Sequence, residues 1–450
     1  MKVLLLNPQY LSPDEMKGRY VRYRDWIETG NMYVHPFEPP LGLANLVAYL
    51  AKHGEQAGLI DLQALDMMDG ELRARLKKDR PDLVGITAMT PTYPSALRLA
   101  KFVREVLPQA KIVMGGVHPT ILPEPVFEEA PVDYVIRGEG EKPMLELVQG
   151  KPPADIDGLC YLKDGSPVIK AKAKGIDPLD ELPMAAYGAF PAERYIEYNR
   201  RLRGISGLSM LVSRGCPYHC AFCAVEGAMG RKYRIKEPKT AIDEMQALKD
   251  KFKIDGIWFK DSIFDLKRDW VKRFCKELIA RGLDMKWQIN TRVDLVDGEM
   301  LGLMKDAGLV QVDLGIESGS QKTLDALNKK ITVEQIRNAV ETAKRYVKVS
   351  GFFMIGVPGE TEKDISDTFR LAKELYLDRY SFSIFVPLPG SDLYDMLLRE
   401  GKLTPNTKFG GIHFTDADKS YCEVPLIRLR EIFKEINDFF SCAVKKGACA

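Results

Sequence analysis

The stretch Ser213–Val225 reads S-R-G-C-P-Y-H-C-A-F-C-A-V and holds three cysteines within eight residues. Cys216, Cys220 and Cys223 follow the pattern C-x3-C-x2-C, which brings three thiolate ligands onto one tight loop. Thiolates at such spacing hold iron–sulfur clusters or zinc. A structural zinc needs a fourth protein ligand, for which only His219 is at hand, whereas a cubane held by three cysteines keeps one iron open. The spacing therefore favours a 4Fe–4S cluster over a zinc knuckle or three unligated core cysteines.

An aromatic residue, Phe222, directly precedes the third cysteine. With this residue the motif resembles the signature of the radical S-adenosylmethionine (SAM) superfamily. In that superfamily the amino and carboxylate groups of SAM chelate the open iron, and one electron from the cluster cleaves SAM to a 5′-deoxyadenosyl radical. The resemblance implies that Phe222 lies at the SAM site and that a donor such as flavodoxin or ferredoxin reduces the cluster.

The bulk composition is that of an ordinary globular protein of two or three domains: 450 residues, 45% hydrophobic and 28% charged. A net charge of +2 gives no electrostatic case for nucleic acid or membrane lipid as a partner. Eight cysteines in so long a chain are not a disulfide framework, and iron binding needs reduced thiols, so we expect a cytoplasmic protein. No apolar run approaches the length of a membrane span.

Residues 1–150 alternate short β-rich runs with helical patterns, which predicts a doubly wound, Rossmann-like, largely parallel sheet. The expected strands are Val3–Leu6, Ala57–Asp61, Leu83–Thr87, Lys111–Gly115 and Tyr134–Arg137. The expected helices are Leu41–His53, Gly70–Lys78, Tyr93–Leu107 and Pro123–Glu129. Ligands of such sheets bind beyond the carboxyl ends of the strands, so the loops that follow the strands are the candidate binding loops.

Three segments of this domain, P-P-L-G-L at Pro39–Leu43, G-G-V-H-P-T at Gly115–Thr120 and G-E-G-E at Gly138–Glu141, resemble the cobalamin-binding domain that precedes many radical SAM cores. That group contains the anaerobic magnesium-protoporphyrin ester cyclase and several carbon methylases. The cobalamin contacts implied by the resemblance are Thr87, Gly115, Gly116, His118, Gly138, Glu139 and Gly140. A degenerate domain that has lost its cobalamin is the competing interpretation.

The motif D-x-H-x-x-G, whose histidine ligates cobalt in other cobalamin domains, is absent from the chain. Cobalt would then lack a protein histidine below the ring. His118 is either an alternative ligand or, as we favour, a loop histidine beside the nucleotide tail of the cofactor.

Residues 151–204 form a connector with a hairpin expected around Tyr161–Ile169, and its D-E-L-P segment resembles the interdomain strap of this family. Residues 205–402 again alternate strands and helices, which predicts a partial (β/α)6 barrel of the TIM type. The expected barrel strands are Ser209–Ser213, Gly256–Lys260, Lys286–Asn290, Gln311–Gly315, Gly351–Gly356 and Ser381–Val386. Active sites of such barrels gather at the carboxyl ends of the strands.

Each barrel strand ends in a polar or glycine-rich segment. The segments F-K-D-S-I-F, N-T-R-V-D, G-I-E-S-G, F-M-I-G-V-P-G-E-T and P-L-P-G-S occur in the same order as in the radical SAM branch. By this resemblance Glu317 and Ser318 fall at the SAM ribose, and Arg292 at the carboxylate or sulfonium side. Asp261 takes the place of the acidic residue near the amine, although many relatives carry two acidic residues there. The competing interpretation of each is a surface polar residue at a loop end.

Residues 403–450 depart from the family pattern. Pro425–Phe440 carries apolar residues at helical spacing, which predicts a closing helix. Cys422, Cys442 and Cys449 lie around it at spacings that are no recognised ligand set for a second cluster.

The sequence thus predicts a radical SAM enzyme with a 4Fe–4S cluster, SAM and cobalamin. The reaction favoured by the resemblance is methylation of an unreactive carbon or phosphorus centre in a small-molecule, lipid-like or protein side-chain substrate. Two alternatives stay open. One is a cobalamin-dependent cyclisation, ring contraction or other rearrangement without methyl transfer, and the other is a cobalamin-binding sensor whose cluster is structural. No individual catalytic side chain is singled out by the sequence.

Overall fold

The structure is a computed structural model that describes residues 1–9, 38–65, 67, 69–404 and 418–445, with side chains described up to Phe440 in the last helix. The chain forms two compact units. The first comprises Met1–Ser206 with the short segment Gly227–Met229, and the second contains the greater part of the described chain from Gly207 onward.

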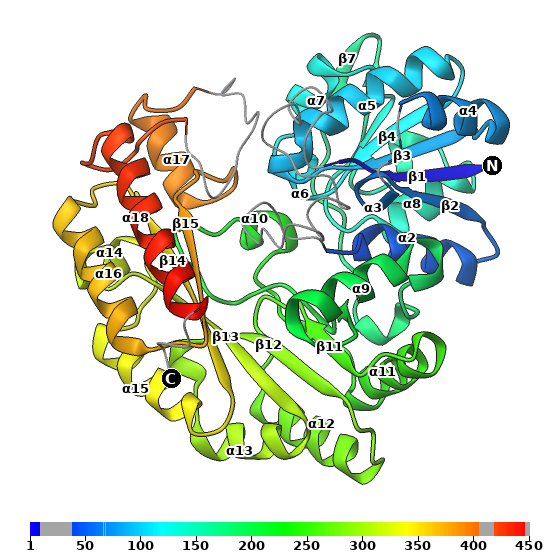
Figure 1. The fold of residues 1–450 in the computed structure, drawn as a ribbon. Coiled ribbons are helices and arrows are strands. Elements are labelled where there is room, and N and C mark those ends of the chain that lie inside the picture. Colours follow the sequence, from blue (N-terminus) through cyan, green and yellow to red (C-terminus); the bar gives the residue numbers. More distant parts are fainter. Residues whose placement is uncertain (10–37, 66, 68, 405–417, 446–450) are drawn as a thin grey trace. The chain divides into compact units, whose positions relative to one another are not determined.

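The first unit is built on a seven-stranded sheet in the order β2-β1-β3-β4-β5-β6-β7 (Figure 1). Its strands are β1 (Val3–Asn7), β2 (Ala57–Asp61), β3 (Leu83–Thr87), β4 (Lys111–Gly115), β5 (Tyr134–Ile136), β6 (Leu159–Lys163) and β7 (Ser166–Val168). The first five strands are parallel, whereas β6 and β7 are antiparallel. The five predicted strands are confirmed to within one residue, and β6–β7 is the hairpin expected in the connector.

Helices cover both faces of this sheet. They are α2 (Leu41–Lys52), α3 (Leu62–Leu65), α4 (Asp69–Asp79), α5 (Tyr93–Val106), α6 (Val117–Ile121), α7 (Glu124–Glu129), α8 (Glu141–Val148) and α9 (Ala192–Arg203). Alternate residues of a strand point to opposite faces. Accordingly Leu4 and Leu6 belong to one apolar core with residues of α4 and α5, and Val3 and Leu5 to another with residues of α2 and α8. This is the doubly wound fold predicted from the sequence.

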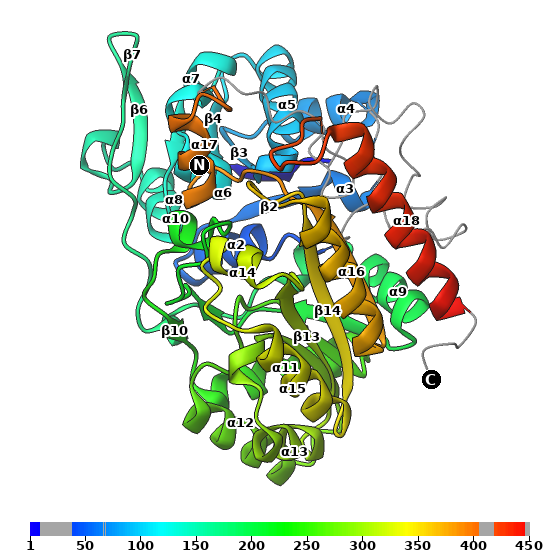
Figure 2. The ribbon, with the colours of Figure 1, turned by 90° about the vertical axis from the view of Figure 1, so that its left-hand side faces the viewer.

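The second unit is a partial barrel, a six-stranded parallel sheet in the order β15-β14-β13-β12-β11-β8. Its strands are β8 (Gly207–Met210), β11 (Gly256–Phe259), β12 (Lys286–Arg292), β13 (Leu309–Glu317), β14 (Lys348–Ile355) and β15 (Arg379–Ile384). Strands of this sheet that are consecutive along the chain are also neighbours in the sheet, and helices connect them across its outer face (Figures 1 and 2). The carboxyl ends of all six strands therefore meet at one edge.

The short helix α10 (Val225–Met229) is divided between the two units. The other helices of this unit are α11 (Pro238–Phe252), α12 (Arg268–Ala280), α13 (Gly298–Asp306), α14 (Gln321–Ala326), α15 (Val333–Lys344), α16 (Glu362–Leu375), α17 (Asp392–Arg399) and α18 (Leu426–Lys445). Five of them begin at a side chain whose oxygen accepts an N–H of the first turn, which fixes their starting points. These capping residues are Asp297, Ser320, Thr332, Thr361 and Ser391.

The strand predicted at Ser209–Ser213 is shorter than expected. β8 ends at Met210, and Ser213–Arg214 (β9) pairs instead with Arg234–Ile235 (β10) in a separate two-stranded sheet. The reason is a buried carboxylate: Asp261 Oδ1 accepts the N–H groups of Val212 and Ser213, which draws the chain away from β11.

The predicted closing helix is confirmed as α18, which lies along β15 (Figure 1). The ring of Phe440 stacks on that of Tyr380, with 3.9 Å between their centroids, and lies 5.5 Å from Phe382. None of the helices in the described part of the chain has the length and apolar character needed to cross a membrane.

Candidate active site

The cysteine loop leaves β9 at the carboxyl edge of the barrel and returns through β10. Its turn requires glycine at position 215, where φ is +83° and a Cβ would lie 2.3 Å from the carbonyl oxygen of Lys232. The N–H of Cys216 donates to the carbonyl of Gly230 at 3.3 Å, and the N–H of Ala221 donates to that of Leu327 at 2.9 Å. The loop is thus fixed by backbone contacts at its base and between its second and third cysteines.

The three thiols of the loop are free and half-buried. Burial raises the pKa of Cys223 to about 11 and also raises the pKa of Cys216, so bound iron would have to stabilise their thiolate forms. Among the described residues, no group of three or more His, Cys, Asp or Glu side chains could hold a single metal ion. A loop with three free thiols fits a cluster, in which each thiolate binds a separate iron.

Arg292, at the end of β12, supports this loop. Its Nε lies 2.8 Å from Asp294 Oδ1, and its Nη2 donates to the carbonyl of Lys329 at 2.7 Å. The guanidinium stacks 3.8 Å from the ring centroid of Tyr218, and its Nη1 lies 3.5 Å from Cys220 Sγ. Arg292 therefore joins the cysteine loop to Asp294 after β12 and to Lys329 after α14, and places a positive charge beside the thiols.

Asp261 follows β11 and is fully buried. Its Oδ1 accepts from the backbone of Val212 and from the N–H and hydroxyl of Ser213, but its Oδ2 is buried and has no hydrogen-bond partner among the described residues. Burial raises the pKa of Asp261 to about 6. Buried carboxylate oxygens are nearly always paired, so Oδ2 fits the position of a ligand's ammonium donor.

Glu317 is the last residue of β13 and lies in a bulge of the β13–β14 pairing. It adopts a left-handed conformation, with φ +66°, which is unusual for a residue with a side chain. Its Oε1 accepts from Lys329 Nζ at 2.7 Å, and no other described residue hydrogen-bonds to the carboxylate. The pair lies over Gly315, since a Cβ there would meet both charged atoms at 2.7 Å. The second oxygen of Glu317 is available to a ligand hydroxyl.

Ser318 is fully buried, and its hydroxyl lies 2.9 Å from Thr368 Oγ1 while also accepting the N–H of Ser320. In the structure it holds the turn after β13. Phe222, next to the third cysteine, lies 5.8 Å from Lys329 Nζ measured to the ring centroid. The barrel edge thus brings together Phe222, Arg292, Glu317 and the three cysteines, while Asp261 contacts the strand from which the cysteine loop starts.

In the first unit, the glycines of the binding loops have contacts within the protein. Gly116 has φ +101°, and a Cβ there would lie 2.6 Å from the carbonyl oxygen of Ala88 and 2.8 Å from Thr87 Oγ1. Gly115 pairs with Thr87 in the sheet. These glycines allow the loop after β4 to pack against the loop after β3.

The G-E-G-E segment is tied to the connector in a similar way. Gly138 has φ +93°, forms a bridge with Ala173 and donates its N–H to Thr120 Oγ1 at 3.0 Å. Glu139 Oε2 accepts the N–H of Ile176 at 3.3 Å, and Gly140 caps α8. Both loops form a surface at the carboxyl edge of the sheet that is shaped mainly by backbone.

His118 is 1% exposed and stacks on Tyr93, with 4.0 Å between the ring centroids. Its Nδ1 lies 3.2 Å from Thr90 Oγ1, and burial lowers its pKa to about 4. Met89, at the tip of the neighbouring loop, is instead 49% exposed beside Thr90 and Thr92. The exposed apolar tip at Met89 fits a large flat ligand such as cobalamin, whereas Thr90, Thr92 and His118 are buried and contact their own domain.

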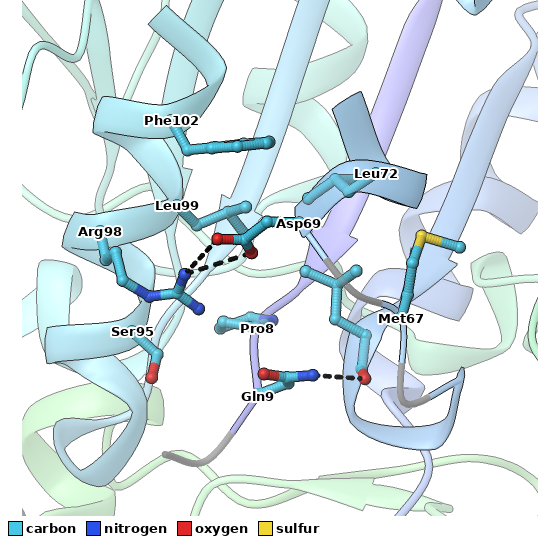
Figure 3. A pocket seen from close by; sticks show the side chains of 10 residues that line it. Pro8, Gln9, Met67, Asp69, Leu72, Ser95, Arg98, Leu99 and Phe102 are labelled. Carbon is cyan, nitrogen blue, oxygen red and sulfur yellow. Dashed lines mark hydrogen bonds and ion pairs between the residues drawn. The ribbon is translucent and has the colours of Figure 1, made fainter. Parts of the chain in front are cut away.

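A pocket opens at the ends of β1 and β2, next to the β1–β3 junction where the strand order reverses (Figure 3). Figure 3 shows Arg98 directed at Asp69. The side-chain amide of Gln9 donates to the carbonyl of Leu62 at 3.5 Å. Ligands of doubly wound sheets bind at such reversal points. Pro8 and Gln9 belong to the loop after β1, which is one of the candidate binding loops, but none of the cobalamin contacts implied by the resemblance lines this pocket.

Sequence reasoning missed the residues that hold the predicted ones in place. These are Lys329 beside Glu317, and Tyr218 and Asp294 around Arg292. Tyr218 and Asp294 lie inside the quoted motifs, so their position in those motifs was a usable signal. Lys329 follows α14 in a segment that no motif included.

Comparison with known proteins agrees with this architecture. Residues 32–148 match the model of the B12 binding domain, and residues 210–372 match that of the radical SAM superfamily. The chain is 33% identical over 371 residues to an uncharacterized methyltransferase of Pyrococcus horikoshii, covering 81% of this chain and 80% of the relative. It is 32% identical over 413 residues to the anaerobic magnesium-protoporphyrin IX monomethyl ester cyclase of Rubrivivax gelatinosus, and the match covers 88% of this chain and 70% of the cyclase.

Among solved structures, the radical SAM methyltransferase TsrM from Kitasatospora setae, with tryptophan and a SAM analogue bound, superposes with a TM-score of 0.71. The alignment covers 89% of this chain and 76% of that one at 21% identity, which shows a shared fold. The chain belongs to the radical SAM enzymes that carry a B12 binding domain, a family of cobalamin-dependent methyltransferases that also includes a cyclase. The protein is thus an enzyme whose cofactors are a 4Fe–4S cluster, SAM and cobalamin.

Proposed function

We propose that the protein methylates an unactivated carbon or phosphorus centre, and that its substrate is a small molecule, a lipid-like molecule or a protein side chain. The observation that carries the proposal is the barrel edge, where a loop of three free thiols lies near two strand ends with acceptors for a ligand: Asp261 Oδ2, to which no described residue hydrogen-bonds, and the second carboxylate oxygen of Glu317. The relative from Pyrococcus horikoshii, named a methyltransferase and matched over 80% of its length, supports this reaction class.

The bound cofactors would supply the chemistry. The cluster and SAM would provide a 5′-deoxyadenosyl radical that takes hydrogen from the substrate, and cobalamin would provide the methyl group. The chain's own residues would bind and orient these groups. Cys216, Cys220 and Cys223 would hold the iron, and Asp261 Oδ2 would accept a hydrogen bond from the ammonium group of SAM. Glu317 would accept the ribose hydroxyls.

Arg292 and Ser318 take supporting roles in this proposal. Arg292 is bonded to Asp294 and to the carbonyl of Lys329, so it keeps a fixed positive charge beside the thiols and the carboxylate end of SAM. Ser318, bonded to Thr368, keeps the turn that presents Glu317.

In the first unit we propose that cobalamin lies over the loops that contain Thr87, Gly115–His118 and Gly138–Gly140, without a histidine on cobalt. The burial of His118 against Tyr93 supports the second part of this statement. We place the enzyme in a reducing cytoplasm, with flavodoxin or ferredoxin as its electron donor, because its cluster thiols must stay reduced.

A second candidate function is a cobalamin-dependent cyclisation or rearrangement. It is favoured by the relative from Rubrivivax gelatinosus, which is named a cyclase and is 32% identical over 88% of this chain. Both reactions need the same cofactors, so the product must separate them.

The experiment is product mass spectrometry of the anaerobically reduced enzyme, given methyl-labelled SAM and fractionated cell extract. A labelled methyl group in a product that depends on the three cysteines supports methylation. A new product without the label, again dependent on the cysteines, would replace methylation by cyclisation or rearrangement. The matched control is the triple variant Cys216→Ala, Cys220→Ala, Cys223→Ala.

A further inference from the structure

Between α14 and α15 lies a short segment, Leu327–Lys330, which we name the lysine turn. The structure assigns to Lys329, within this turn, the role of a positioning residue that holds the Glu317 carboxylate in place relative to the cysteine loop. The inference rests on the proposed function, because it takes Glu317 as the residue that binds the SAM ribose.

The lysine turn is bonded to the cysteine loop at successive residues. The carbonyl of Leu327 accepts the N–H of Ala221 at 2.9 Å, and Asn328 Nδ2 donates to the carbonyl of His219 at 2.6 Å. The carbonyl of Lys329 accepts from Arg292 Nη2 at 2.7 Å, and Arg292 itself stacks on the cysteine loop. The position of the lysine turn is therefore set by the loop that holds the thiols.

The backbone of the lysine turn ends α14, since the N–H groups of Asn328 and Lys329 donate to the carbonyls of Asp325 and Leu324 at 2.9 and 3.1 Å, a common helix ending in which Asn readily adopts the left-handed conformation. Asn328 has φ +49° and Lys330 has φ +57°, both in the left-handed region. A lysine rarely adopts this conformation, so the surrounding contacts must hold Lys330 in it. The turn directs the Lys329 side chain inward, whereas Lys330 is exposed.

Lys329 connects the lysine turn to Glu317, because its ammonium group donates a hydrogen bond to the Glu317 carboxylate. The Nζ–Oε1 distance is 2.7 Å, and the two side chains are only 6% and 11% exposed. A buried carboxylate keeps its charge when it is paired, and without a partner it takes up a proton or turns away. One oxygen of Glu317 is held by Lys329, so the other faces a fixed direction, as a carboxylate that accepts ribose hydroxyls requires.

These contacts form one continuous path from the thiols to Glu317. SAM in the proposed site binds the open iron at one end and Glu317 at its ribose, so the path sets the separation between the two attachment points. Lys329 acts through Glu317, since its ammonium is already bonded to that carboxylate.

The experiment is a double-mutant cycle on the full chain, reconstituted anaerobically with iron and sulfide. The variants are Glu317→Gln, Lys329→Met and the double variant. Lys330→Met is the matched control, because it makes the same substitution at the next residue, whose side chain is exposed. Equilibrium SAM affinity, 5′-deoxyadenosine formation and the electron paramagnetic resonance spectrum of the reduced cluster, with and without SAM, are measured for each.

We expect Lys329→Met to keep its cluster but to lose roughly ten- to a hundredfold in SAM affinity, the consequence of disturbing a charge-assisted contact. The double variant should bind SAM no more weakly than Glu317→Gln alone, because Lys329 has nothing left to position. Lys329→Arg should recover a large part of the loss, and Lys330→Met should behave as the native protein.

Three results would overturn the assignment: unchanged SAM affinity in Lys329→Met, losses that add fully in the double variant, or loss of the cluster in Lys329→Met while Lys330→Met retains it. Failure of the proposed function is recognised separately, since the native protein would then hold its cluster but neither bind nor cleave SAM.

Discussion

The carboxyl edges of the two sheets differ in how their polar side chains are engaged. At the barrel edge, Asp261 keeps a buried oxygen without a described partner, and Glu317 keeps an oxygen available beside its bond to Lys329. At the edge of the first sheet, His118 is buried on Tyr93 and Glu139 is bonded to the connector. The barrel edge therefore suits a small ligand held by a few individual side chains, and the first edge a large ligand held by loop shape.

This difference predicts where single substitutions act. At the barrel edge, changes at Glu317 and the three cysteines should reduce ligand binding far more than they reduce the stability of the fold. Changes in the first unit should matter mainly where they alter the backbone of a loop.

The largest effect is expected at the cysteine loop. Replacing Cys216, Cys220 and Cys223 together by Ala removes every thiolate of the motif, so the reconstituted protein should lose its iron–sulfur absorbance and all 5′-deoxyadenosine formation. Iron analysis checks this against the native chain, for which about four irons are expected. Full iron content in the variant, or stoichiometric zinc in the native protein, would refute the cluster.

The next effect concerns Glu317→Ala. Removing a charge-assisted acceptor costs about 1.5–3 kcal/mol, or roughly ten- to a hundredfold in SAM affinity, whereas cluster and cobalamin spectra should persist. Isothermal titration with SAM and quantification of 5′-deoxyadenosine measure it. If affinity and cleavage equal those of the native protein, Glu317 lies outside the SAM site.

Gly116→Ala should act through the backbone. At φ +101° an added Cβ meets Ala88 and Thr87 at less than 3 Å, so the loop must shift, and we expect a loss of about 1–3 kcal/mol together with weaker cobalamin retention. Gly70→Ala, in α4 with open space around it, is the control that should cause neither. Thermal unfolding and cobalamin absorbance after gel filtration report the two effects, and a native-like Gly116→Ala would argue against a loop held by shape.

A smaller, pH-dependent effect is expected from His118. Burial lowers the pKa of His118 from 6.5 to about 4. As the pH falls, this imidazole is therefore protonated near pH 6.5 in the unfolded chain but only near pH 4 in the folded chain. Stability should therefore fall as the pH drops through this window, by up to about 3 kcal/mol. Unfolding midpoints between pH 4 and pH 8 should show this slope in the native protein but less of it in His118→Gln; equal slopes would contradict the burial of a neutral imidazole.

The strands could be predicted from the sequence because each is a short apolar run that ends at a polar or turn-forming residue. β4 (Lys111–Gly115), for example, ends at the glycine that begins the loop. The shortening of β8 could not be predicted, since it depends on Asp261, which lies about fifty residues further along and competes for the N–H groups of Val212 and Ser213.

The candidate site divides in the same way. Cys216, Cys220, Cys223 and Glu317 were identifiable because they lie in short motifs at strand ends. Lys329 was not, because its contact with Glu317 depends on two left-handed residues on either side of it, and their conformation leaves no periodic signal in the sequence.

The most direct test of the account is the stoichiometry of one anaerobic turnover with methyl-labelled SAM and the product-forming fraction. If one SAM supplies the radical and another the methyl group, 5′-deoxyadenosine, S-adenosylhomocysteine and labelled product should form in equal amounts. Formation of 5′-deoxyadenosine with product but without S-adenosylhomocysteine or label would contradict methyl transfer by this enzyme.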